Sequence, residues 1–196
     1  MRLMTVERFE ALAKRLQQGE AVLFPTDTLP ALATIPAAAG RIWQLKQRPA
    51  DKPLILMGAS AAQLLPALGQ EPPEGWQELA NLGWPGALTL VLPATGPIVE
   101  SLNPGGSGSL GLRVPACEPA LELLRTSGPL ATSSANRSGE PACRTADELA
   151  RCFPDVSRLD LDPWEQGSGQ ASTVVAWGAE GWRVLRRGQV VVPQRA

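Results

Sequence analysis

The chain has 196 residues, 44% of them hydrophobic, and its 18 lysines and arginines nearly balance its 19 aspartates and glutamates. This length fits one well-packed domain, and a net charge of -1 excludes a global positive field that would hold a polyanion. The chain has no histidine and no tyrosine, which excludes Ser-His-Asp triads, histidine general bases and histidine zinc sites.

Hydrophobic periodicity predicts a helix and then a buried strand at the start of the chain. Apolar residues recur at helical spacing over residues 6–16, where Thr5 is placed as N-cap and Gly19 ends the helix. The apolar run 21–24 is closed by Pro25, which is typical of a buried strand.

The rest of the chain alternates helical and strand-like segments. We expect further helices at 37–47, after Ser60, and at 74–82, 119–125 and 145–152, the last with a capping box of Thr145 and Glu148. We expect further strands at 53–57, 87–92, 110–114, 129–132 and 189–192, and a hairpin of 172–177 with 182–185. Residues 93–109, rich in glycine, proline and serine, predict a long surface loop. Its 103–108 core lacks the G-K-[ST] ending of a phosphate loop, which favours a flexible connector.

Interleaved helices and strands with an antiparallel hairpin at the end predict an α/β fold. We expect a twisted, open, mixed sheet flanked by helices, in a single domain of residues 1–196. In such sheets ligands sit beyond the carboxyl ends of strands. Thr26, Thr28, Ser134 and Asn136 all follow predicted strands and are therefore candidate ligand contacts.

Two short polar motifs lie at the ends of apolar elements. Lys46-Gln47-Arg48 ends a predicted helix, and Ser134-Ala135-Asn136 follows a predicted strand. The donor fork of arginine and the point charge of lysine suit phosphate oxygens, so the two motifs predict a phosphate cradle. At a helix end the same charges also fit solvated side chains near the terminal carbonyls, and Ser134 and Asn136 also fit a turn.

Six motifs in a fixed order resemble the YrdC/Sua5 family in its short, single-domain TsaC form. They cover the chain from about residue 20 to 190. The motifs are Pro25-Thr26-Asp27-Thr28, Leu45-Lys46-Gln47-Arg48-Pro49, Trp84-Pro85-Gly86-Ala87-Leu88-Thr89, Gly111-Leu112-Arg113-Val114-Pro115, Thr132-Ser133-Ser134-Ala135-Asn136-Arg137-Ser138-Gly139 and Ser172-Thr173-Val174-Val175. The resemblance implies a YrdC-like α/β fold without the C-terminal Sua5 domain of longer relatives.

The resemblance also implies an activity, that of L-threonylcarbamoyladenylate synthase. This nucleotidyltransferase joins L-threonine, bicarbonate and ATP into threonylcarbamoyl-AMP and releases pyrophosphate, for the t6A modification of tRNA. ATP is then a substrate accompanied by Mg²⁺, and tRNA or the t6A transfer machinery is an expected partner. The alternative is a divergent, non-catalytic YrdC-like paralogue that binds nucleotide or RNA, either tRNA or double-stranded RNA.

Site residues follow from the resemblance, position by position. The implied threonine site is Thr26, Arg113 and Ser172. The implied ATP site is Lys46, Arg48, Thr132, Ser134, Asn136 and Arg186, with Lys46 and Arg48 as the catalytic pair and no protein metal ligand. A structural ion pair is the less favoured alternative for Arg113. The family usually continues its P-T-[DE]-T motif with an aromatic residue and glycine, whereas this chain has Leu29-Pro30-Ala31.

Location and partners are indicated by what the sequence lacks. Residues 1–14 are charged and offer no apolar leader, and no run approaches the roughly 18 apolar residues of a membrane span, so we expect a cytoplasmic protein with no membrane partner. The odd number of cysteines (Cys117, Cys143, Cys152) speaks against a disulfide framework and favours reduced thiols. The C-terminal arginines fit contacts to RNA phosphates and a solvated edge equally well; they are Arg183, Arg186, Arg187 and Arg195.

Overall fold

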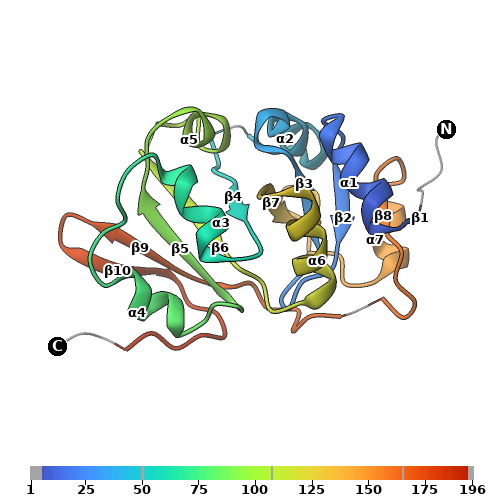
Figure 1. Ribbon diagram of the computed structural model, residues 1–196. Coiled ribbons are helices and arrows are strands. Elements are labelled where there is room, and N and C mark those ends of the chain that lie inside the picture. The colour runs from blue at the N-terminus through green and yellow to red at the C-terminus, as the bar shows by residue number, and fades with distance from the viewer. Residues whose placement is uncertain (1–5, 50, 107, 165, 194–196) are drawn as a thin grey trace.

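A computed structural model describes residues 6–49, 51–106, 108–164 and 166–193. In this part of the chain ten strands form one sheet in the order β1-β8-β2-β3-β7-β4-β6-β5-β9-β10 (Figure 1). The strands are β1 (Val6–Glu7), β2 (Val22–Phe24), β3 (Ala31–Thr34), β4 (Ile55–Met57), β5 (Leu88–Pro93), β6 (Ser109–Arg113), β7 (Leu130–Ser134), β8 (Ser157–Leu159), β9 (Thr173–Gly178) and β10 (Gly181–Arg186). Parallel pairs such as β4–β6 and antiparallel pairs such as β3–β7 both occur, which confirms the predicted mixed sheet.

Helices flank this sheet along its whole length (Figure 1). They are α1 (Phe9–Gln17), α2 (Gly40–Lys46), α3 (Ala61–Leu64), α4 (Trp76–Asn81), α5 (Pro97–Leu102), α6 (Glu118–Ser127) and α7 (Ala146–Cys152), with 3-10 turns η1 (Pro36–Ala38) and η2 (Leu65–Leu68). Ser60 caps α3, and the capping box of Thr145 and Glu148 starts α7, both as predicted. Within the described residues, no helix has the length and hydrophobicity that a membrane span requires.

One face of the sheet is packed with leucines over its central strands. The register places Leu56 beside both Ala131 of β7 and Leu112 of β6, and Leu90 beside Leu112 and Val175. These side chains are buried in one cluster together with residues of α2, α3, α4, α5 and α7. Burial of this apolar area is the main source of stability for the fold.

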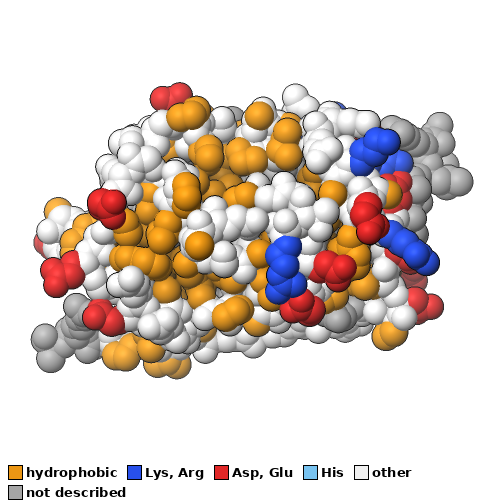
Figure 2. Space-filling model, viewed as in Figure 1, with side chains coloured by type: hydrophobic (Ala, Val, Ile, Leu, Met, Phe, Trp, Pro, Cys, Tyr) orange, Lys and Arg blue, Asp and Glu red, His pale blue; other side chains and the backbone are white. Residues whose placement is uncertain are grey.

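The opposite face is covered over only half of its width. Over β2, β3 and β8 it packs against α1 and α6, in a second cluster that contains Leu12, Leu123 and Phe24. Over β7, β4, β6, β5 and β9, no helix of the described residues covers the row that the register aligns, which is Thr132, Ile55, Gly111, Val91 and Ala176. Figure 2 shows the lysines and arginines of this view over the half with α1 and α6, whereas the half with α3, α4 and α5 shows apolar atoms and scattered acidic side chains. The uncovered part of the sheet is therefore the natural place for a ligand.

Three predictions about elements are wrong. Val6 belongs to β1, which pairs with β8, and the helix begins at Phe9 with Arg8 as N-cap; Thr5 lies outside the described residues. The expected loop at 93–109 contains α5, because Gly96 and then Pro97 at the first helical position start a helix. Residues 189–192 form no strand, since the Thr173 hydroxyl donates to Val190 O (2.8 Å) and accepts from Val190 N (3.1 Å).

Candidate active site

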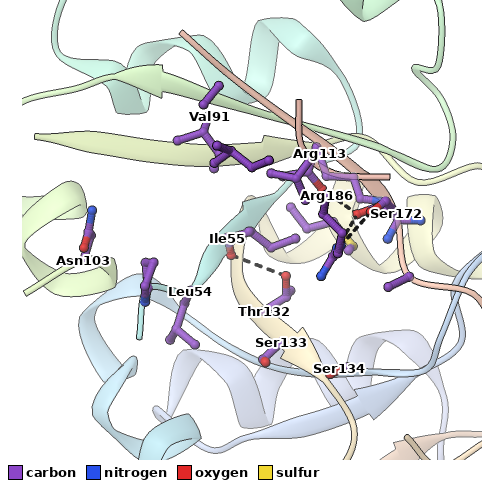
Figure 3. A pocket seen from close by; sticks show the side chains of 18 of the residues that line it. Leu54, Ile55, Val91, Asn103, Arg113, Thr132, Ser133, Ser134, Ser172 and Arg186 are labelled. Atoms are coloured by element: carbon purple, nitrogen blue, oxygen red, sulfur yellow. Dashed lines mark hydrogen bonds between the residues drawn. The ribbon is translucent and has the colours of Figure 1, made fainter. Parts of the chain in front are cut away.

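A cavity of about 700 Å³ lies on the uncovered face of the sheet (Figure 3). Its floor comes from alternate residues of β7, β4, β6, β5 and β9, and β10 and the segment 28–31 close its sides. The charged residues among the described lining are all arginines: Arg48, Arg113, Arg183 and Arg186. Positive charge without a lining carboxylate favours an anionic ligand.

Arg113, the last residue of β6, is held from three sides and is only 4% exposed. Its guanidinium donates to Gly86 O (3.0 Å), Thr28 Oγ1 (2.8 Å) and Asp27 Oδ1 (2.7 Å). Burial lowers the pKa of Arg113 and the Asp27 carboxylate counters this, so the side chain stays charged. Arg113 therefore forms a structural ion pair, with Asp27, as one of the two sequence-based interpretations expected. A guanidinium has five N–H groups, which leaves two for a ligand in the cavity.

The turn of residues 26–28, which follows β2, provides two of the oxygen atoms that accept hydrogen bonds from Arg113: Thr28 Oγ1 and Asp27 Oδ1. The Thr26 hydroxyl donates to Leu29 O (2.7 Å) and accepts from Thr28 N (3.2 Å), so this buried side chain holds the turn from behind the cavity. Asp27 also accepts from Ala116 N (3.1 Å). Gly167 packs against the turn so closely that a Cβ would lie 2.4 Å from Thr26 O. The turn is therefore fixed on both sides before any ligand binds.

Replacing Gly167 with alanine is expected to displace this turn. The new methyl group would meet backbone atoms of Thr26, Asp27 and Thr28 within 2.4–2.6 Å, and backbone cannot rotate away. We expect ligand affinity at Arg113 to fall about tenfold or more, since a misplacement of about 1 Å costs up to roughly a hundredfold. Gly178→Ala is the matched control, because no atom lies within 4 Å of its Cβ position. Calorimetric titration of L-threonine into both variants measures the effect; equal affinities would contradict it.

Ser172 and Arg186 line the cavity beside Arg113 (Figure 3). The Ser172 hydroxyl hydrogen-bonds Thr89 Oγ1 (2.8 Å) and accepts from Arg186 Nη2 (3.2 Å), while Arg186 Nε donates to Ser172 O (2.9 Å). Figure 3 shows Ser172, Arg186 and Arg113 side by side. The side chains expected to contact threonine and nucleotide are thus neighbours, although Arg113 and Arg186 come from different strands.

Lys46 lies behind the cavity, in a cage of oxygens. Helix α2 ends at this residue because Gln47 has φ 51°, in the left-handed region. The Lys46 ammonium donates to Ser134 O (2.5 Å), Asn136 O (2.7 Å) and Asn136 Oδ1 (3.0 Å), which uses all three of its N–H groups. Burial, with the nearby charge of Arg48, lowers the pKa of Lys46 to about 8. Lys46 thus holds residues 134–136, called here the 134–136 turn, in place through these hydrogen bonds. It is not among the residues that line the cavity.

The other expected nucleotide contacts surround this turn. Arg48 donates to Pro53 O (3.1 Å) and, more weakly, to Ser133 Oγ (3.4 Å); its buried Nε has no partner in the described part of the chain. Thr132 donates to Ile55 O (3.3 Å), and Ser134 donates to Asn136 Oδ1 (2.7 Å). Arg48, Thr132 and Ser134 line the cavity, whereas Asn136 supports Ser134 from behind.

The structure brings most of the expected residues to one cavity and adds others. The expected residues in its lining are Arg48, Arg113, Thr132, Ser134, Ser172 and Arg186. Thr26, Lys46 and Asn136 form a layer behind it. Sequence reasoning did not place Asp27, Trp177 or Arg183 in this site, although the last two line the cavity; it grouped Arg183 with the C-terminal arginines. The alternation in β5 and β6, leucine on one side and Thr89, Gly111 or Arg113 on the other, was the signal for this open face.

Comparisons with known proteins identify the family of this chain. The profile of a family described as telomere recombination (Sua5/YciO/YrdC) matches residues 14–188. The threonylcarbamoyl-AMP synthase of Pyrococcus abyssi is 41% identical over 163 residues, which cover 82% of this chain and 48% of that protein. The enzyme of the same name from Vibrio campbellii is 32% identical over 187 residues, 93% of this chain and 100% of that protein. The chain thus spans about half of the first relative and the full length of the second.

Solved structures show the same fold. The crystal structure of P. abyssi Sua5 complexed with L-threonine superposes with a TM-score of 0.84 at 34% identity, over 96% of this chain and 57% of that one. Escherichia coli YciO superposes with a TM-score of 0.79 over 97% of this chain and 96% of that one, at 18% identity, which shows the fold alone. With the profile match and these relatives, the chain belongs to the Sua5/YciO/YrdC family, which includes threonylcarbamoyl-AMP synthases.

Proposed function

We propose that this protein is an L-threonylcarbamoyladenylate synthase, which makes threonylcarbamoyl-AMP and pyrophosphate from L-threonine, bicarbonate and ATP. The observation that carries the proposal is the cavity whose charged lining residues are all arginines. Threonine presents a carboxylate, bicarbonate an anion and ATP a triphosphate, so each substrate matches a positive wall. The relatives named threonylcarbamoyl-AMP synthase support this function over the non-catalytic alternative.

In the proposed amino-acid half of the cavity, Arg113 pairs with the threonine carboxylate through its two remaining N–H groups. The Asp27 ion pair keeps the guanidinium in place, so little side-chain entropy is lost when threonine binds. The hydroxyl of Ser172 is a candidate partner for the threonine side chain or amine. The segment 29–31, which differs from the usual family motif, lines this cavity and leaves it open.

In the proposed nucleotide half, Arg48 and Arg186 bind phosphate oxygens. The unpartnered Nε of Arg48 is a donor that a phosphate oxygen satisfies. When the threonine carbamate oxygen attacks the α-phosphorus, these cations stabilise the charge that develops as pyrophosphate leaves. No protein nucleophile takes part, because positioning and charge stabilisation supply most of such a transfer.

Mg²⁺ enters this proposal as part of the substrate, bound to the phosphates of ATP. The described residues contain no group of three or more acidic or cysteine side chains that would hold a metal ion. The cavity lining likewise has no carboxylate among its described residues. This donor set fits an ion that arrives with the nucleotide, and not one held by the protein.

The direct test is release of pyrophosphate from ATP by the purified protein with L-threonine, bicarbonate and Mg²⁺. We expect threonine-dependent release, a product with the mass of threonylcarbamoyl-AMP, and a loss of about tenfold or more in Arg48→Ala. Arg125→Ala is the matched control, since Arg125 is exposed on α6 and pairs with the surface residue Glu118. No threonine-dependent release, together with salt-sensitive tRNA binding that Arg48→Ala leaves unchanged, would favour the RNA-binding alternative.

A further inference from the structure

A second cavity, of about 470 Å³, lies beside α7 and contains two thiols. Cys143 is buried and Cys152, at the end of α7, is partly exposed; both line this cavity. The two residues are nine positions apart in sequence and line the same cavity, and burial, together with the neighbouring Cys152, raises the pKa of Cys143. The third cysteine, Cys117, is buried in the other apolar cluster, against Pro25 O. Only the first two thiols therefore form a pair that reagents reach from solvent.

This thiol pair lies directly behind the 134–136 turn. Cys143 N donates to Ala135 O (3.0 Å), which is the middle residue of the turn. The guanidinium of Arg137 donates to Leu45 O and to Cys152 O (3.0 Å), so one side chain joins the end of α2 to the end of α7. Ser138 N donates to Lys46 O (2.8 Å). The cysteines, Lys46 and the turn thus belong to one connected group.

We propose that Cys143 and Cys152 form a redox-active pair, which closes to an intramolecular disulfide under mild oxidation and clamps the 134–136 turn to the end of α7. The bond would link the segment that follows the turn to the helix that Arg137 already holds. A covalent link in this position restricts opening of the turn, because it reduces the freedom of the locally unfolded state. The site goes beyond the proposed function and involves none of its substrates.

The chemistry needs a peroxide, and its atoms balance. The more exposed Cys152 loses its proton and attacks one oxygen of hydrogen peroxide, which gives a sulfenic acid and, after protonation of the leaving hydroxide, water. The sulfur of Cys143 then attacks the sulfenic sulfur; its proton and the sulfenic hydroxyl leave as a second water. Two thiols and one peroxide thus give one disulfide and two waters. Burial raises the pKa of Cys143 to about 12, so this thiol stays protonated and acts second.

The test uses the full chain with hydrogen peroxide near stoichiometric amounts. We expect a mass loss of two hydrogens, a non-reduced peptide that joins residues 143 and 152, and full reversal by a thiol reductant. Amide exchange of residues 134–143 should be several-fold slower in the oxidised protein, while exchange of α6 stays the same. Higher acids of Cys152 without the cross-link, cross-links between molecules, or unchanged exchange at 134–143 would each overturn the proposal.

Matched variants separate the pair from the third thiol. Cys117→Ser should still form the cross-link, whereas Cys152→Ser and Cys143→Ser should not. The wild-type mass measurement needs neither variant to fold, so the proposal stays falsifiable if one of them is unstable. Because no substrate is present, failure of the cross-link leaves the proposed function untouched, and failure of pyrophosphate release leaves the thiol pair untouched.

Discussion

Arg113→Lys is expected to reduce threonine-dependent pyrophosphate release by about a hundredfold or more, although it keeps the positive charge. A lysine ammonium cannot reproduce the planar fork that donates to Gly86 O, Thr28 Oγ1 and Asp27 Oδ1 while it presents further N–H groups to the cavity. Two charge-assisted hydrogen bonds to a carboxylate are worth about 1.5–3 kcal/mol each, and about 1.4 kcal/mol corresponds to a factor of ten.

Steady-state kinetics show whether the lost activity reflects a higher KM for threonine or a higher KM for ATP. If Arg113 binds the threonine carboxylate, KM for threonine rises strongly while KM for ATP changes little. Arg125→Lys is the matched control on the exposed face of α6. A threonine KM equal to that of the unmodified protein would leave Arg113 with only its structural ion pair to Asp27.

Lys46→Met is expected to destabilise the protein and to weaken ATP binding together. Methionine fills a similar volume but leaves Asn136 O without the ammonium donor, whereas Ser134 O and Asn136 Oδ1 lose the ammonium but keep hydrogen bonds from Asn136 N and the Ser134 hydroxyl. A buried acceptor without a partner costs about 1–3 kcal/mol. Relief of the buried charge offsets part of this, since the pKa of Lys46 is already lowered to about 8. We expect a net loss on the order of 2 kcal/mol, or roughly 4–8 °C in Tm.

Thermal unfolding and ATP titration of the same variant check this expectation. Lys14→Met makes the same change at an exposed position of α1 and should alter the free energy of unfolding by less than about 0.5 kcal/mol. If Lys46 acts by holding the 134–136 turn, stability and ATP affinity fall together. A variant with the stability of the wild type and no ATP binding would instead assign Lys46 to the phosphates.

Elements with local signals were predictable from the sequence. The capping box at Thr145 and Glu148, Ser60 as N-cap and the hairpin around residues 178–181 all depend on neighbours within a few positions. Strand β3 was missed because its four residues, Ala31–Thr34, follow Pro30 and contain two alanines. Strands β1 and β8 are two and three residues long and exist through pairing with each other and with β2. Strands of two or three residues are too short to show a hydrophobic periodicity in the sequence.

The candidate site likewise combines features that the sequence predicts with features that it does not. The K-x-R and S-x-N motifs could be recognised, but their geometry could not. Lys46 lies 90 residues from Asn136, and nothing near either one indicates that carbonyl oxygens of the second motif surround the first. Likewise Asp27 and Arg113 are 86 residues apart, so the ion pair that orients the arginine follows only from the register of the sheet.

These long separations affect how the protein is made. Three hydrogen-bonded pairs of the site, Lys46 with Ser134, Arg113 with Thr28 and Thr89 with Ser172, have partners 88, 85 and 83 positions apart in sequence. Arg186, which closes the cavity, lies ten residues before the end of the printed sequence. A ribosome that adds roughly 5–20 residues per second therefore exposes an incomplete sheet for several seconds. During synthesis the cavity cannot bind its ligands, and the central strands expose unpaired edges of the kind that can pair with other chains until the last strands are added.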